Sequence, residues 1–175
     1  MHDSVLEYVG SWVEFLELED KKVLDIGSYD VNGSTRQFFT GEYIGLDMRA
    51  GPGVDIVSGS WDIDLPDASF DVIVSTEMLE HDEYPAHTFD EIRRLLKPNG
   101  YVILTCRGPG YPLHEYPGDY HRFTPQDLND WLEHVGIEVI DTHPDEEVPG
   151  AFAVGFLPVD APLMGGYAPK LRGVV

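Results

Sequence analysis

The chain is poor in cysteine and in basic residues, and each shortage excludes a class of protein. Cys106 is the single cysteine among 175 residues, so an internal disulfide and a multi-cysteine zinc site are both excluded. Lys and Arg number 11 against 32 Asp and Glu, which gives a formal net charge of −21. Nucleic acids and anionic membranes are bound through clustered basic side chains, so both are disfavoured as partners.

Long apolar runs and a basic amino-terminal segment are also missing. No run is apolar enough over a sufficient length to cross a bilayer, and residues 1–10 include acidic residues but no Lys or Arg. Secretory signals begin with a basic region, so the sequence predicts none and a cytoplasmic location is expected. The length suits a single domain, residues 1–158, followed by a tail, residues 159–175, that contains several Gly and Pro residues.

The pattern of apolar residues predicts strands that alternate with helices. Helical spacing indicates amphipathic helices over residues 4–16, 34–39, 85–96 and 125–135. Such alternation is typical of an α/β protein with a Rossmann-like, doubly wound, mostly parallel sheet and helices on both of its faces. The seven expected strands are short apolar runs at residues 22–27, 43–47, 54–57, 70–75, 101–105, 137–142 and 151–157.

Two other segments have features of their own. Lys97-Pro-Asn-Gly100 is a stop-and-turn signal before the fifth expected strand. Residues 106–123 are rich in Gly, Pro, Tyr and His and have no clear period, and this segment is too long for a simple connector. We expect it to form a substrate-side loop or lid. Cys106, at its start, is expected to be a semi-buried small residue rather than a nucleophile.

Ligands of such sheets bind at the carboxyl ends of the strands, which directs attention to the residues just after them. Gly27 and Gly33 follow the first strand, where glycine permits a tight turn and a close approach of the backbone to a ligand. An ordinary strand-to-helix turn is the alternative. Asp47 ends the second strand and can accept hydrogen bonds from both hydroxyls of a ribose, or it can cap a turn. Asp25 and Asp47 lie on two adjacent expected strands, and together these two acids predict an adenosine-containing ligand.

The spacing of the glycines distinguishes two such ligands. A dinucleotide requires G-x-G-x-x-G, which places its pyrophosphate at a helix N-terminus. Here Gly33 is the next glycine after Gly27, and Tyr29 and Asp30 lie between them. An acid in this loop would repel a pyrophosphate. S-adenosylmethionine has no phosphate and carries an ammonium and a sulfonium cation, so the loop favours it over NAD.

Six motifs follow one another in order along the chain: Val23-Leu-Asp-Ile-Gly27, Tyr43-Ile-Gly-Leu-Asp47, Leu65-Pro-Asp-Ala-Ser-Phe-Asp71, Glu77-Met-Leu-Glu-His81, Glu91-Ile-Arg-Arg-Leu-Leu-Lys-Pro-Asn-Gly100 and Arg122-Phe-Thr-Pro125. This ordered series resembles the class I S-adenosylmethionine-dependent methyltransferases, and among them the broad group that includes the quinone-biosynthesis type. The resemblance extends from about residue 22 to residue 136 and implies methyl transfer that leaves S-adenosylhomocysteine as product.

The resemblance implies roles at the methionine and ribose ends of the cofactor. Asp25, Gly27 and Ser28 would line the methionine end. Thr76, just past the fourth strand, would lie near the cofactor's amino group, and Asp47 would hold the ribose hydroxyls.

The resemblance also implies how adenine is bound, with one choice left open. Met48 would pack on the adenine face and Trp61 would flank its edge. The family often has an acid that accepts a hydrogen bond from the adenine amine. Ser60 stands nearest that position and Asp62 follows two residues later, and the sequence does not decide between them.

The glycine loop departs from the family pattern. Tyr29 and Asp30 stand where the family's G-x-G-x-G has its second glycine region. The loop is therefore expected to follow a different path, with Asn32 and Gly33 at its far end.

Methyl transfer from a sulfonium is an in-line displacement, for which the protein mainly supplies proximity and orientation. A base is needed only where the nucleophile must lose a proton. The candidates are His81, His114 and His121, although His81 also suits helix entry and the other two suit a solvated loop. Nearby aromatic and basic residues would complete a pocket for a small-molecule acceptor: Arg107, Tyr111, Tyr116 and Tyr120.

Metal binding and two other functions were weighed against this interpretation. The possible ligands within residues 80–87 and 114–121 lack a recognised spacing, so no metal site is predicted. A non-catalytic S-adenosylmethionine-binding or scaffold protein is one alternative, which the altered glycine loop supports. An NAD-dependent oxidoreductase is the other, which the loop spacing disfavours. The sequence predicts neither the acceptor nor the attacked atom, nor the oligomeric state, and a protein acceptor stays open.

Overall fold

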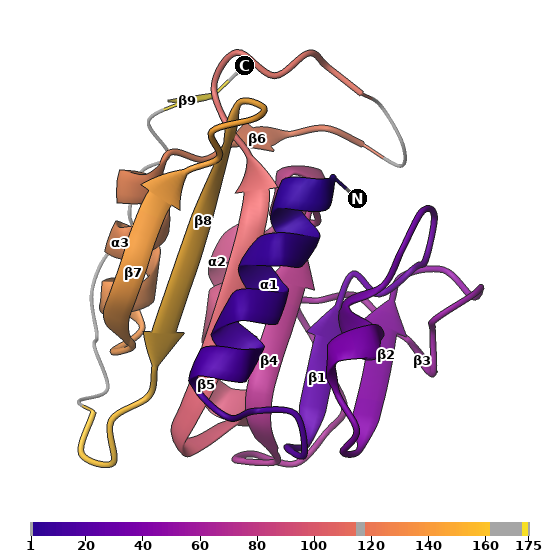
Figure 1. The fold of residues 1–175 in the computed structure, drawn as a ribbon, viewed down its shortest axis with the longest axis vertical. Coiled ribbons are helices and arrows are strands. Elements are labelled where there is room, and N and C mark those ends of the chain that lie inside the picture. The colour runs from indigo at the N-terminus through magenta and orange to yellow at the C-terminus, as the bar shows by residue number, and fades with distance from the viewer. Residues whose placement is uncertain (1, 115–117, 162–172, 175) are drawn as a thin grey trace.

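A seven-stranded sheet forms the centre of the protein (Figure 1). The computed structural model describes residues 2–114, 118–161 and 173–174. The strands follow the order β3-β2-β1-β4-β5-β8-β7 across the sheet. Their bounds are β1 (Val23–Ile26), β2 (Tyr43–Asp47), β3 (Ile56–Val57), β4 (Phe70–Thr76), β5 (Leu96–Arg107), β7 (Glu138–Pro144) and β8 (Gly150–Phe156).

The direction of the strands confirms the expected Rossmann-like class. Strands β1 to β5 pair in parallel, whereas β8 runs antiparallel to both β5 and β7. The chain leaves β1 toward β2 and β3 on one side, then returns to β4 on the other side of β1. This reversal lies between β1 and β4, where ligands of such sheets bind at the carboxyl ends of the strands.

Helices cover both faces of the sheet, as expected (Figure 1). Helix α1 (Asp3–Phe15) lies on one face, and α2 (Pro85–Leu95) and α3 (Pro125–His134) lie on the other. Alternate residues of β4 supply the two cores, because successive side chains of a strand point to opposite faces. Val72 and Val74 belong to the cluster that contains Val9 of α1, whereas Ile73 belongs to the cluster that contains Ile92 of α2.

Two elements differ in detail from the sequence prediction. The helix expected at residues 34–39 is the 3₁₀-helix η1 (Thr35–Phe38), and a second one, η2 (Leu79–His81), follows β4. Strand β5 begins at Leu96 rather than at residue 101, because the expected turn is absorbed as an irregularity in its pairing with β4. Within it, Asn99 has a φ of 63°, a left-handed conformation that asparagine tolerates.

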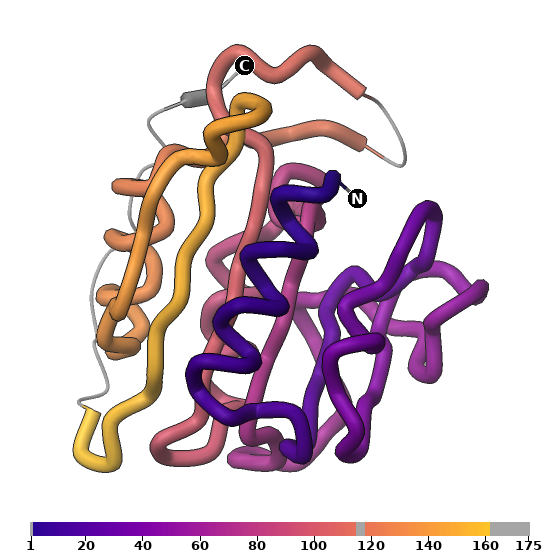
Figure 2. The backbone as a smooth tube through the Cα atoms, in the orientation of Figure 1, coloured from indigo at the N-terminus to yellow at the C-terminus, as the bar shows by residue number. Residues whose placement is uncertain are grey.

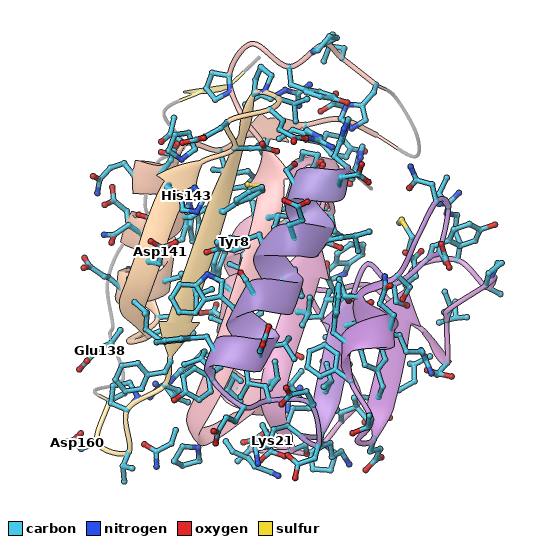
Figure 3. All side chains as sticks on the ribbon, viewed as in Figure 1. Tyr8, Lys21, Glu138, Asp141, His143 and Asp160 are labelled. Carbon is cyan, nitrogen blue, oxygen red and sulfur yellow. The ribbon has the colours of Figure 1, made fainter. Side chains whose placement is uncertain are left out.

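Helix α1 is fixed to the antiparallel edge of the sheet by polar and aromatic contacts. The Tyr8 hydroxyl donates to Oδ2 of Asp141 at 3.2 Å, and the Tyr8 ring stacks on Phe152 at 4.6 Å between centroids. Figure 3 shows Tyr8 on α1 facing the strand that carries Asp141 and His143. Burial and the Asp141 carboxylate both raise the pKa of Tyr8. The same helix also reaches the loop after β1, where its Leu6 side chain lies close to Gly33.

The segment after β5 passes over the carboxyl ends of the parallel strands (Figure 2). It contains the short strand β6 (His121–Arg122), which pairs antiparallel with β9 (Gly173–Val174). Residues 115–117, which include Glu115 and Tyr116, lie outside the described residues, as do most of the tail residues. Within the part of the chain that the structure describes, no helix is long and apolar enough to cross a membrane.

Helix α3 begins at a capping box formed by Thr124 and Asp127. The Thr124 hydroxyl accepts from the backbone N–H of Asp127 at 3.1 Å, and the Asp127 carboxylate accepts from the backbone N–H of Thr124 at 2.8 Å. Replacing Thr124 with alanine is expected to lower the free energy of unfolding by about 1 kcal/mol, because a first-turn N–H loses its acceptor. Urea unfolding measures this loss. Thr124→Ser retains the hydroxyl and is the control, and equal stability of both variants would contradict the assignment.

Candidate active site

Two adjoining cavities lie at the carboxyl ends of β1, β2 and β4. The larger, about 230 Å³, and the smaller, about 140 Å³, share Gly27, Tyr29, Val31 and Glu77 in their walls. Of the residues predicted to bind a cofactor, the smaller cavity is lined by Asp25, Gly27, Ser28, Asn32, Gly33 and Thr76. The larger cavity is lined by Gly27, Asp47, Met48, Ser60 and Trp61.

Gly27 makes the turn between β1 and both cavities. Its φ is +89°, a conformation that favours glycine, and its N–H donates to the carbonyl of Leu46 at 2.8 Å. A Cβ at this position would lie 2.5 Å from Cγ of Met78. The glycine is therefore required both by the backbone and by the packing of Met78 against the turn.

The structure shows the path that the glycine loop follows at Tyr29 and Asp30, where it departs from the G-x-G-x-G pattern. The Asp30 N–H donates to the carbonyl of Pro52 at 2.9 Å, and its Oδ1 accepts from the N–H of Gly33 at 2.8 Å. The Tyr29 ring lies under the Arg49 guanidinium, 4.7 Å from ring centroid to Cζ. The loop is thus held against the connection from β2 to β3. Tyr29 and Arg49 both line the larger cavity, and neither was predicted as a site residue.

Asp47 lies between the glycine loop and the β2–β3 connection. Its Oδ2 accepts from the N–H of Tyr29 at 3.3 Å and its Oδ1 accepts from the N–H of Arg49 at 3.0 Å. Its side chain is 13% exposed and lines the larger cavity. Each carboxylate oxygen can accept more than one hydrogen bond, so the backbone contacts orient Asp47 and leave acceptor capacity for a ligand.

Asp25 is a buried acid in the wall of the smaller cavity. It is 4% exposed, and its Oδ2 accepts a hydrogen bond of 2.7 Å from the Tyr43 hydroxyl. Its Oδ1 has no hydrogen-bond partner among the described residues. Burial raises the pKa of Asp25 to about 6. A carboxylate in this state would gain a partner from a cationic ligand in the smaller cavity.

The structure separates the two candidates for adenine recognition. Ser60 is 7% exposed and lines the larger cavity, where its hydroxyl lies 2.9 Å from that of Thr88. Thr88 in turn donates to Oδ2 of Asp82 at 2.5 Å. Asp62 is exposed and outside the walls of both cavities. The geometry therefore favours Ser60 as the residue that contacts the adenine. Its hydroxyl is held in place by Thr88, which is hydrogen-bonded to the buried Asp82.

A buried ionic cluster, Glu77, Glu80 and Arg107, lies beside the larger cavity. Arg107 is 4% exposed and forms an ion pair with Glu77, while Glu80 has no exposed surface. Burial raises the pKa of both glutamates above the ordinary value. Glu77 follows β4 with a φ of 55°, strain that often accompanies a functional site. Sequence reasoning did not predict this cluster, because Arg107 is far from the glutamates along the chain.

The three candidate histidines lie on the side of the larger cavity nearest β6. His81 lines the cavity, and the His114 ring lies 4.7 Å from the His81 ring between centroids. His121 is half-buried, and burial lowers its pKa. Tyr120 also lines the cavity, and Tyr111 packs its ring against Arg107 at 4.4 Å. The structure therefore gathers the histidines and most of the expected acceptor-pocket residues at one end of the sheet.

Cys106 is more buried than the sequence predicted. It has no exposed surface, and burial raises the pKa of its thiol. A buried thiol of this kind is inert, so the structure supports its interpretation as a packing residue.

Comparison with known proteins gives the family. Residues 24–104 match the family model described as a methyltransferase domain. A ubiquinone biosynthesis O-methyltransferase from Pseudomonas aeruginosa is 30% identical over 165 residues, which covers 75% of this chain and 71% of that protein. The chain belongs to the S-adenosylmethionine-dependent methyltransferase family.

A second relative shares a shorter region with the chain, and a solved structure matches most of it. A ubiquinone biosynthesis O-methyltransferase from Nitrosococcus oceani is 39% identical over 87 residues, which covers 41% of this chain and 37% of that protein. The chain therefore spans less than half the length of that relative. The crystal structure of the 1,6-didemethyltoxoflavin-N1-methyltransferase from Burkholderia thailandensis, with bound S-adenosylhomocysteine, matches with a TM-score of 0.72. At 15% identity over 88% of this chain and 78% of that one, this likeness shows the methyltransferase fold.

Proposed function

We propose that the protein transfers a methyl group from S-adenosylmethionine to a small-molecule acceptor. The observation that carries this proposal is the pair of adjoining cavities, with the carboxylate of Asp25 in one and that of Asp47 in the other. The names of the relatives support a small acceptor, because they refer to ubiquinone biosynthesis and toxoflavin. The formal net charge of −21 supports an acceptor other than nucleic acid.

The described residues fit this cofactor at the methionine end. The free Oδ1 of buried Asp25 suits the cofactor's ammonium group, and Ser28, Asn32 and Thr76 supply further polar groups in the smaller cavity. A dinucleotide fits less well, because Asp30 occupies the loop where a pyrophosphate would need backbone N–H donors and Gly33 already donates to that acid.

The larger cavity would hold the nucleoside. Asp47 would accept from the ribose hydroxyls, Met48 and Trp61 would flank the adenine, and Ser60 would contact its edge. Met48 and Trp61 are 49% and 36% exposed, so an adenine would cover apolar surface that is otherwise in contact with water.

The cofactor supplies a methyl group that is already activated by its positive sulfur. The residues of the chain then have to exclude water, align the acceptor and, for a hydroxyl acceptor, receive a proton. We propose that this proton acceptor is one of His81, His114 and His121. His81 lines the larger cavity, the His114 ring packs against His81, and His121 follows Tyr120, which also lines the cavity.

Calorimetric titration with S-adenosylhomocysteine tests the cofactor site. We expect saturable binding at one site, and an affinity at least about tenfold weaker in Asp47→Ala, because a charged hydrogen-bond acceptor is lost. Asp62→Ala is the matched control, since Asp62 is exposed outside both cavities and its removal should leave the affinity unchanged.

Two results of this titration would contradict the proposal. One is the absence of binding by the native protein at millimolar ligand, and the other is an equal loss of affinity in the Asp47 and Asp62 variants. Binding of the product without any transfer to phenolic or other small acceptors would favour the non-catalytic alternative. Quenching of tryptophan fluorescence by NADH, in place of S-adenosylhomocysteine binding, would favour the oxidoreductase.

A further inference from the structure

We propose that Glu80, His81 and His114 bind a divalent transition-metal ion. Each residue offers one ligand atom, and these atoms all lie within 4.8 Å of one another. The Oε1 of Glu80 and the Nε2 of His114 are 3.9 Å apart. Tetrahedral ligands at about 2.0–2.2 Å from a zinc ion lie roughly 3.4 Å from each other, so a small contraction of these side chains completes the set.

Glu80 provides an independent indication of a missing cation. It has no exposed surface, and neither of its carboxylate oxygens accepts a hydrogen bond from a described side chain. The backbone N–H groups of Glu80 and Arg107 face the carboxylate, and the Arg107 and Arg122 guanidinium groups act on it electrostatically. The neighbouring guanidinium of Arg107 is engaged in its ion pair with Glu77. Burial of a carboxylate is costly unless a cation or hydrogen bonds compensate it, and a metal ion would supply that compensation.

Both histidines are oriented as metal ligands usually are. The Nδ1 of His114 is hydrogen-bonded to the carbonyl oxygen of Pro112 at 3.4 Å and lies 3.1 Å from Oδ2 of Asp119. The Nδ1 of His81 is hydrogen-bonded to the carbonyl oxygen of Gly118. An acceptor that holds the Nδ1–H of each ring leaves the lone pair of Nε2 for a metal. Such carboxylate or carbonyl partners are characteristic of metal-bound histidines, where they fix the tautomer and the ring orientation.

Asp119 is itself held firmly in place. Arg122 donates to both of its carboxylate oxygens, including a contact of 2.6 Å from Nη2 to Oδ2. The Asp119 carboxylate also accepts from the backbone N–H of His114 at 2.9 Å. The segment after β5 is therefore built so that it presents His114 to the end of η2, where Glu80 and His81 lie.

The chemistry of the ligands indicates the class of ion. Two imidazoles and one carboxylate suit Zn²⁺, Mn²⁺, Fe²⁺ or Co²⁺ better than Ca²⁺ or Mg²⁺, which prefer oxygen ligands. Three protein ligands also leave a coordination position open, as in catalytic zinc sites.

The site adjoins the larger cavity through His81. An acceptor oxygen at the open position would be polarised and would lose its proton more easily. This link to the acceptor rests on the proposed methyl transfer, whereas metal binding does not. It also removes His81 and His114 from the candidate bases, which leaves His121.

Titration of the chelator-treated full chain with Co²⁺ tests the site, because the visible absorption of Co²⁺ reports its ligands and geometry. We expect one ion per chain, displaced by Zn²⁺, with an affinity at least tenfold weaker in Glu80→Gln and in His114→Ala. Asp119→Asn should weaken binding by about 10–100-fold, as loss of the carboxylate beside a metal-binding histidine does at other metal sites. His87→Ala is the matched control, since His87 is exposed outside the ligand set and should bind as the native protein does.

The proposal is overturned by either of two results. The native protein fails to bind Co²⁺ and Zn²⁺ at millimolar concentration, or the three site variants bind as tightly as His87→Ala. Titration of the native protein with S-adenosylhomocysteine, in the presence of chelator, keeps the two proposals separate. Product binding without metal binding rejects the metal site alone, and metal binding without product binding rejects the cofactor site alone.

Discussion

Replacing Arg107 with methionine is expected to lower the free energy of unfolding by about 3–5 kcal/mol at pH 7, in metal-free buffer. The guanidinium is 4% exposed and pairs with Glu77, whose side chain is 15% exposed, next to the fully buried Glu80. Without Arg107 the two carboxylates stay close together in a poorly solvated place with no cation between them. Urea unfolding followed by tryptophan fluorescence measures the loss.

Two further variants show whether this cost comes from an unpaired buried charge. The double variant Glu77→Gln, Arg107→Met removes both members of the pair and should recover most of the lost stability. Lys97→Met breaks the ion pair between Lys97 and Asp71, in which the two side chains are 39% and 33% exposed. This change should lower the free energy of unfolding by no more than about 1 kcal/mol. If Arg107→Met and Lys97→Met lower the free energy of unfolding equally, the buried pair contributes no more to stability than the exposed pair.

The second large effect is an increase in stability. Asp25→Asn is expected to raise the free energy of unfolding by about 3 kcal/mol at pH 8, since each unit of pKa shift corresponds to about 1.4 kcal/mol. Burial raises the pKa of Asp25 from 3.8 to about 6. Between these values the folded protein binds more protons than the unfolded chain, so the native protein loses stability as the pH rises through this window. Asparagine lacks this titration and still offers an oxygen to Tyr43.

The measurement is the free energy of unfolding of both proteins from pH 4 to pH 8. The stability difference between Asp25→Asn and the native protein should grow up to about pH 6 and then level off. Asp62→Asn is the control, because Asp62 is exposed and its variant should differ from the native protein by a small, constant amount. A difference that stays constant for Asp25→Asn would refute a destabilising carboxylate. We also expect the variant to bind S-adenosylhomocysteine more weakly, since the charge suits the ligand's ammonium.

Much of the fold could be predicted because local patterns determine its elements. Buried parallel strands are continuous apolar runs, and β1, β2 and β4 appear in the sequence as such. The capping box at Thr124 is likewise contained in four consecutive residues. The predicted start of β5 was wrong, because pairing with β4 outweighs the turn signal of residues 97–100. Pairing between segments that are distant along the chain is not visible in the local sequence.

The candidate site also contains residues that local patterns predict and residues that they do not. Asp47 was predictable because it ends an apolar run, and Asp25 because it lies near the end of the run that stops at Gly27. Adjacent parallel strands place these ends together. The pairing of Arg107 with Glu77, and of His114 with Glu80, depends on how the segment after β5 folds back over η2. No spacing rule connects these residues, so the sequence indicated an acid-rich motif without its cationic partners. The choice between Ser60 and Asp62 similarly required the walls of the cavity.

The left-handed backbone of Glu77 has an evolutionary consequence. At a φ of 55° glycine or asparagine would be the easier residue, so the glutamate stands there against the local preference of the chain. The arginine without an acid opposite it would be as poorly placed as the acid without the arginine. We therefore expect relatives of this protein either to keep both residues or to have replaced both.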